Sequence, residues 1–510
     1  MLVAVVAGLT AVALVARLSV LPRSGFFHDD AWQVVAAVHG SPGQLLEIGG
    51  NQPGFTAVLM ALAPLLGPAS RAYTYPALVV GAVGPAVLLW FLRRLGNRLS
   101  TATLLAAALV VAEIPVIYSG RVKTYVLDPL LVIAVIVVVE RLARRTWRWQ
   151  TGAAWAVGSL AIGTVSPFAL LATVAGGLVL VAHAERDRRR RAVAVGAHLA
   201  LAAGFVLFTQ RSYHSGRLRN FWRFKEEAFI GLDETPASLV PDPPALVLDT
   251  WRHLRQLLVV YPGGPGWLAT VLTVVALAGL GVLCFGRHRL VGRTFVVLLG
   301  LAVLGSMAAR VPFGALQTTG LRVSLWTVPL VAAGLATAFT TVSQPLLRLG
   351  SGRRVVDGVC CVGAVLVLIL GYPHDVRYGN RGTAPATAFV EDQTGAGDVV
   401  LLLFSTHFAF AAETDRPIRL SNDPQLLHGI GLDIPAPGIV LVPHGVPTSQ
   451  QVAVVEDATG GASRVFVMSA ITAPDGPDPS TAVASELDRI GFDGPATRQF
   501  GGTSVEIWQR

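Results

Sequence analysis

Two adjacent carboxylates, Asp29 and Asp30, stand just after the first apolar run, in the stretch His28-Asp29-Asp30-Ala31-Trp32. Acidic side chains beside hydrocarbon are costly, and a functional site is a common reason for keeping them. A positioned carboxylate can take a proton from a hydroxyl group or hold a divalent cation. A structural role is equally open, since either aspartate can cap a short interfacial helix that Trp32 anchors.

A second polar group combines Arg121, Lys123, Tyr125 and Asp128, the last followed by a proline. Lys123 is one of only two lysines in the chain, the other being Lys225, and the topology described below places both outside. Positive residues on the outside run against the charge bias of membrane proteins. A phosphate group is one reason to keep them there, and snorkelling of the side chains to lipid headgroups is the other.

Two further groups are cationic. The stretch from Arg211 to Lys225 interleaves aromatic and basic residues, among them Tyr213 and His214. That mixture suits a phosphosugar or lipid phosphate, and equally a basic interfacial helix on anionic lipid. Arg322, at the start of a later apolar run, is either a phosphate ligand or a snorkelling anchor. We interpret His253 and His407 as ordinary loop and tail residues.

The elements that must position these residues are apolar helices. Hydrophobic residues make up 53% of the 510 residues and charged residues 14%, against about 25% in a soluble domain. About eleven runs are apolar and close to the length of a membrane span. They fall at about 1–21, 73–92, 100–118, 125–141, 152–165, 168–184, 192–208, 266–285, 293–309, 322–342 and 355–372.

Arginine clusters between the runs predict the orientation. They lie at 93–98, 141–148, 186–191, 287–293 and 348–354. All fall on one side if the N-terminus is cytoplasmic and 152–184 is a hairpin bent at Ser166-Pro167. The net charge of +9 is then a topology signal and not a nucleic-acid footprint. This topology requires the apolar run 55–68, which contains Pro64, to be interfacial or re-entrant.

The tail differs in composition. Residues 376–510 hold eight arginines, no lysine and fifteen acidic residues. Short apolar runs at 399–403, 439–442, 465–468 and 504–508 predict strands, and 481–490 predicts a helix that ends at Gly491. We therefore expect a transmembrane domain over 1–375, with outside loops at 22–72 and 209–265, and an extracytoplasmic α/β domain over 376–510. The three cysteines lie in apolar runs and offer no disulfide framework or zinc spacing.

The order of these features resembles the GT-C membrane glycosyltransferases, nearest the protein O-mannosyltransferases and the lipid A aminoarabinose transferase. Members begin with one span and an outside loop that opens with an acidic pair, here Asp29-Asp30. A proline-containing helix start follows, here Gln52-Pro53, and later an outside stretch that here reads Thr124-Tyr125-Val126-Leu127-Asp128-Pro129. Many members carry a lysine where this chain has Asn51 and another where it has Ser166-Pro167, which leaves the donor sugar open.

The resemblance implies an enzyme that moves a sugar from a polyprenyl phosphate to a hydroxyl group of an extracytoplasmic glycan, lipid or protein. Asp29 would be the general base, and Asp30 would orient it or bind a divalent metal ion such as Mg²⁺ or Mn²⁺. Donor contacts would come from His28, Arg121, Lys123, Tyr125, Asp128, Tyr213, His214 and Arg322.

Two other readings of the sequence stay open. A transporter or flippase of a lipid-linked sugar would place ionisable residues near the bilayer midplane, usually within inverted repeats. The chain shows no such repeat, and its candidate ionisable residues gather at one face. A non-catalytic membrane scaffold that reads ligands with its tail is the third reading.

Overall fold

The computed structural model describes residues 1–22, 24–45, 52–69, 71–184, 187–212, 223, 227–231, 243–263, 266–348, 351–371, 382–422, 430–443, 448–470 and 479–510. The chain forms two compact units. The helical unit comprises Met1–Ser19 and Pro76–Asp375. The sheet unit comprises Val20–Tyr75 and Val376–Arg510, so each unit is built from two separate stretches of chain.

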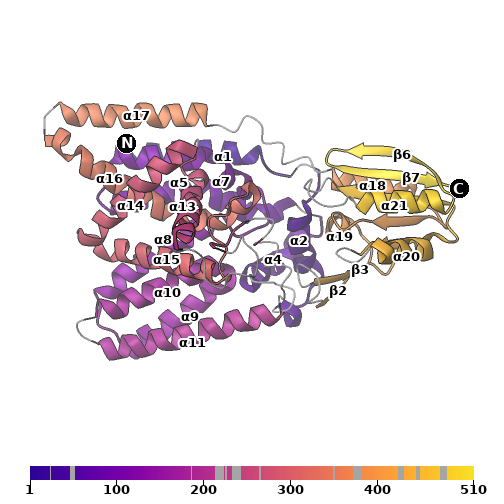
Figure 1. The fold of residues 1–510 in the computed structure, drawn as a ribbon, viewed down its shortest axis with the longest axis horizontal. Coiled ribbons are helices and arrows are strands. Elements are labelled where there is room, and N and C mark those ends of the chain that lie inside the picture. Colours follow the sequence, from indigo (N-terminus) through magenta and orange to yellow (C-terminus); the bar gives the residue numbers. More distant parts are fainter. Residues whose placement is uncertain are drawn as a thin grey trace. The chain divides into compact units, whose positions relative to one another are not determined.

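Every apolar run expected to be a span forms helix, because long apolar stretches satisfy their backbone groups internally in this conformation. The helices are α1 (Leu2–Leu18), α5 (Tyr75–Arg94), α6 (Leu99–Val111) with α7 (Glu113–Ser119), α8 (Asp128–Ala143), α9 (Trp149–Val165), α10 (Pro167–Ala182), α11 (Arg188–Ser212), α14 (Gly266–Phe285), α15 (Arg289–Met307), α16 (Val328–Arg348) and α17 (Gly352–Leu370) (Figure 1). The amphipathic α13 (Pro243–Val260) and the 3-10 helix η4 (Thr318–Thr327) complete the described elements of this unit.

Not every expected span forms one long, uninterrupted apolar helix. Within the described ranges, five helices are individually long and apolar enough to cross a membrane, or six if α6 and α7, which meet at 58°, form one broken span. Two other apolar helices of this unit, α1 and α10, have 17 and 16 residues and are shorter than that length. The expected bend at Ser166 is present, and the Ser166 hydroxyl accepts a hydrogen bond from the Ala169 N–H to begin α10.

Close helix packing depends on small residues. A Cβ atom added to Gly279 of α14 would lie 1.9 Å from the Gly334 carbonyl oxygen of α16. The two backbones therefore touch, as they do where small residues face each other in membrane helix pairs. Large apolar side chains such as Val79, Val157 and Val271 are exposed on other faces, which suits contact with lipid.

The sheet unit is built on a mixed sheet with strand order β4-β1-β5-β7-β6. Parallel pairing joins β1 (Val399–Leu402) to β4 (Ile439–Leu441) and β5 (Arg464–Ala470), and β7 (Thr503–Gln509) runs antiparallel to β5 and β6 (Asp493–Phe500). All four residues of β1 are buried, as in a strand covered on both faces. The strands expected at four positions and the helix α21 (Pro479–Arg489) are present, whereas β6 and the β2–β3 pair (Arg419–Asn422, Ile430–Asp433) were not predicted.

The stretch after the first span packs with the tail. It contains α2 (His28–His39), η1 (Pro42–Gln44), α4 (Pro53–Leu66) and η2 (Arg71–Thr74). The Thr383 hydroxyl of α18 (Thr383–Gln393) donates to the Phe26 carbonyl at 3.2 Å, and the Ala69 N–H donates to the Ala412 carbonyl at 3.1 Å. The sequence-based division had assigned residues 22–72 to the transmembrane domain, so the compact units follow a different boundary.

Candidate functional site

The acidic pair occupies the first turn of α2. Phe27, in an extended conformation, is the N-cap and makes no side-chain cap hydrogen bond, so neither Asp29 nor Asp30 caps the helix. Carboxylates in a first turn interact favourably with the positive end of the helix dipole. Asp30 is 2% exposed and Asp29 is half-buried. Trp32 is buried as well, so the anchoring role considered for it at a membrane surface does not fit.

The tail supports this turn directly. The His28 ring lies 4.7 Å from the ring of Phe404 and 5.6 Å from that of Phe408, measured between centroids. Phe408 belongs to α19 (His407–Glu413), which packs along α2. The position of Asp29 therefore depends on residues about 375 positions later in the chain.

His407 is more than an ordinary tail residue. Its Nε2 lies 2.8 Å from the Leu402 carbonyl oxygen, to which it donates. This bond fixes the turn between β1 and α19, and so the helix on which α2 rests.

Glu413, at the end of α19, is a titratable acid that lies beside the chain just before α2. Burial raises the pKa of Glu413 to about 7, although the nearby Arg71 guanidinium and the Phe26 N–H, which donates to the carboxylate, act in the opposite direction. Arg71 also donates to the Pro22 carbonyl at 3.4 Å. These contacts hold the chain where it enters α2.

The cationic residues lie in the helical unit, on two neighbouring segments. Residues 120–127 join α7 to α8, and η4, which carries Arg322, packs against both helices. The Arg121 guanidinium stands 5.7 Å from the centre of the Tyr118 ring, which meets the Tyr125 ring edge-on at 5.3 Å. Lys123 and Arg322 are both 8% exposed. Tyr213 and His214 lie outside the described residues.

Asp128 begins α8 and is almost completely buried. It accepts a hydrogen bond from Ser166 at the break between α9 and α10. Its Oδ1 has no partner among the residues that the structure describes. An unsatisfied buried carboxylate oxygen is costly, which is expected at a ligand site.

Arg17 is a residue that the sequence analysis missed. It lies in the apolar α1, is 1% exposed, and donates to the Leu109 carbonyl at 3.2 Å and the Val110 carbonyl at 3.0 Å. The break between α6 and α7 deprives these two carbonyls of their usual partners four residues later. Arg17 also donates to the Ser119 hydroxyl, the last residue of α7, at 3.2 Å. It therefore positions the start of the cationic loop, residues 120–127, which carries Arg121 and Lys123. The sequence signal for Arg17 was a single arginine inside the first apolar run.

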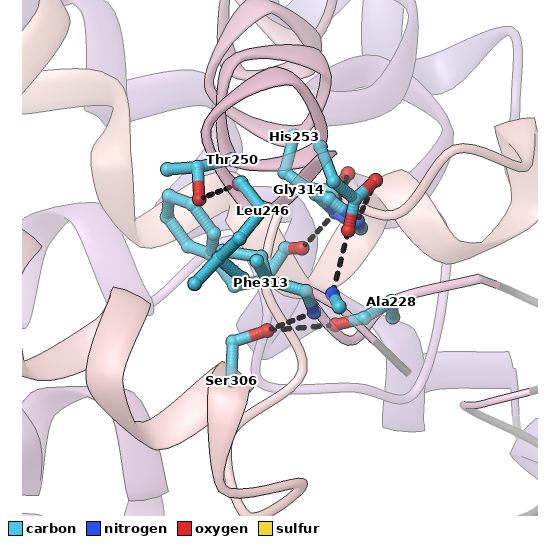
Figure 2. A network of polar contacts seen from close by, with 10 residues as sticks. Ala228, Leu246, Thr250, His253, Ser306, Phe313 and Gly314 are labelled. Atoms are coloured by element: carbon cyan, nitrogen blue, oxygen red, sulfur yellow. Dashed lines mark hydrogen bonds and ion pairs between the residues drawn. The ribbon is translucent and has the colours of Figure 1, made fainter. Parts of the chain in front are cut away.

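His253 is also more than a loop residue. It lies on α13 with no exposed surface, and its Nδ1 stands 2.9 Å from the carbonyl oxygens of both Phe313 and Gly314 (Figure 2). Two acceptors require Nδ1 to carry the proton. Figure 2 also shows Ser306 donating to the Ala228 carbonyl at 3.3 Å. This buried network fixes the segment that leads into η4 and Arg322.

The donor set for a metal ion is limited. Among the described residues, no group of three or more His, Cys, Asp or Glu side chains is placed to hold one. Asp29 and Asp30 would therefore supply two carboxylates, and oxygens of substrate and water would complete the shell that Mg²⁺ prefers.

Comparison with known proteins identifies the fold. No protein-family model matches the chain. No curated protein matches it either. Two solved structures of ArnT from Cupriavidus metallidurans are similar over 99% of this chain and 97% of theirs. The structure bound to undecaprenyl phosphate has a TM-score of 0.52 at 11% sequence identity, and the apo structure 0.53 at 12%. The chain thus has the GT-C membrane-protein fold with a small C-terminal sheet domain, as the resemblance predicted.

Proposed function

We propose that this protein is an integral membrane glycosyltransferase that moves a sugar from a polyprenyl phosphate to an acceptor hydroxyl group with inversion at the anomeric carbon. The observation that carries the proposal is the likeness, along almost the whole chain, to a transferase that was solved with undecaprenyl phosphate bound. The acidic pair in the first turn of α2 and the cations beside η4 supply the chemical groups such a reaction needs.

In the proposed reaction, the acceptor oxygen bonds to the anomeric carbon as the bond from that carbon to the phosphate oxygen breaks. Asp29 takes the hydroxyl proton, and a base at this position accelerates such a step by roughly 10²–10⁴. Asp30 is more buried than Asp29 and serves to orient it or to share a divalent cation. The leaving group is the polyprenyl phosphate.

Charge on the leaving phosphate is stabilised by Arg121, Lys123 and Arg322. Two neighbouring segments carry them, and two of the three are nearly buried, where cations act on a developing anion more strongly than in water. His28, Tyr125 and Asp128 complete the proposed contacts with the donor, together with Tyr213 and His214. The active site faces the extracytoplasmic side, with the N-terminus in the cytoplasm.

The test uses purified full-length protein in sealed proteoliposomes with radiolabelled polyprenyl-phosphate sugars: mannose, arabinofuranose, galactose and glucose. Formation of a labelled glycosidic product together with free polyprenyl phosphate supports the enzyme. Movement of the intact donor across the bilayer, with no bond formed, would instead identify a flippase.

A second arm concerns the donor phosphate. Arg121→Gln with Lys123→Gln should raise the apparent KM for the donor by about tenfold or more, because each charged hydrogen bond contributes about 1.5–3 kcal/mol. Arg348→Gln, which removes an exposed arginine from the last turn of α16, serves as the matched control.

A further inference from the structure

A polar cavity of about 170 Å³ lies in the helical unit where α8 and α10 end and α15 begins. Its polar walls are Glu140, Arg144, His183, Arg287, His288 and Arg289. A buried water needs roughly 10–15 Å³ of such space, so the cavity is large enough for a hydrated anion or a headgroup phosphate. It is remote from Asp128, because its lining residues Glu140 and Arg144 lie about 18–24 Å further along α8.

The cavity carries an excess of positive charge. Among the described residues that line it, the only acid is Glu140, which is 4% exposed and already paired. Glu140 Oε2 accepts hydrogen bonds from Arg94 Nη2 at 3.0 Å and Nε at 3.2 Å, and Oε1 lies 3.3 Å from His288 Nδ1. Arg94 stands outside the cavity and cancels the charge of Glu140. The three arginines of the wall have no acidic partner within the part of the chain that the structure describes.

The described residues offer no ion pair to Arg144, Arg287 or Arg289. The positive end of α15 adds to their charge, since that helix begins at Arg289. The negative ends of α8 and α10 also meet here, and Arg144 and His183 occupy their C-cap positions. Basic residues in short membrane loops generally fix orientation by spreading toward headgroups, which requires no shared cavity. In this protein the basic residues instead line a shared cavity.

We propose that this cavity binds a phosphate group, of either an anionic lipid headgroup or a soluble phosphate, at the end of the bundle remote from the donor site. Guanidinium groups pair with phosphate through two parallel hydrogen bonds, and basic pockets between membrane helices are known to hold lipid headgroups. This inference does not rest on the proposed transferase reaction, and none of the described lining residues of the cavity is a candidate residue for that reaction.

The experiment uses full-length protein and a variant combining Arg144→Gln, Arg287→Gln and Arg289→Gln. The control combines Arg188→Gln and Arg189→Gln, two exposed arginines at the start of α11 that do not line the cavity. Native mass spectrometry measures cardiolipin and phosphatidylglycerol retained from vesicles that also contain phosphatidylcholine. Thermal unfolding measures stabilisation by inorganic phosphate and pyrophosphate, and the unfolding midpoint without ligand reports on folding.

Selective retention of anionic lipid that falls by about tenfold or more in the cavity variant, but not in the control, supports a headgroup site. Protection by phosphate or pyrophosphate that the cavity variant loses, without lipid retention, supports a soluble phosphate. Equal loss in the control and cavity variants, or no binding of either probe by the wild-type protein, overturns the proposal.

Discussion

Replacing Arg17 tests whether a buried arginine holds the broken helix pair α6–α7 together. In Arg17→Met, the carbonyls of Leu109 and Val110 lose their donors, and an unsatisfied buried acceptor costs about 1–3 kcal/mol. For two carbonyls this cost is about 2–6 kcal/mol. Part of it is offset, because the variant no longer buries a charge in the membrane. We therefore expect a net loss of stability of about 1–3 kcal/mol.

The assay is thermal unfolding in a single detergent, together with hydrogen exchange of the amides of α7. Arg17→Met should lower the midpoint and speed exchange around Ser119, and transfer activity should fall because the cationic loop loses its support. Arg17→Lys should give a midpoint and an exchange rate between those of the wild-type protein and Arg17→Met. One ammonium group cannot donate to several carbonyls in the fixed geometry of a guanidinium group. Arg348→Met, at an exposed site, is the control. Unchanged exchange and midpoint in Arg17→Met would refute the reasoning.

Three further predictions concern packing, pH and positioning. Gly279→Val should lower the unfolding midpoint by several degrees by forcing α14 from α16, whereas Gly281→Val, with open space around it, should not; similar midpoints would contradict this. Glu413 keeps its proton in the folded state up to about pH 7 but loses it near pH 4.3 when unfolded, so stability should fall by up to about 3 kcal/mol between these values. In denaturant titrations between these pH values, the free energy of unfolding of Glu413→Gln should not fall in this way. The same fall with pH in the variant and the wild-type protein would contradict the prediction. Phe408→Leu should slow transfer by loosening His28, and it should also lower the midpoint because buried volume is lost; an unaltered rate would show that the ring contact is dispensable.

Local patterns sufficed for the helices and most strands, because hydropathy and turn residues act over short stretches of chain. They also located Asp29 and Asp30, since the end of a span can be read from sequence. They did not reveal that Phe26 is bonded to Thr383, because nothing near either residue encodes a contact across 357 positions.

Arg17 shows the same limit. One arginine near the end of an apolar run resembles a membrane anchor, and its partners lie 92 and 93 residues away. His253 had no local signal either, because its acceptors are backbone carbonyls on another segment. Side chains whose role depends on distant backbone are therefore where sequence reasoning fails in this protein.

The rate of sugar transfer by the double variant Asp29→Asn, Asp30→Asn, measured in a single turnover with saturating polyprenyl-phosphate sugar, tests whether the acidic pair of α2 supplies the general base. The substitutions keep the size of both side chains and remove the base. We expect a loss of roughly 10²–10⁴ in rate with donor binding retained, while Asp433→Asn, at an exposed position of the same unit, keeps wild-type activity. Full activity of the double variant would contradict the assignment of Asp29 as the general base.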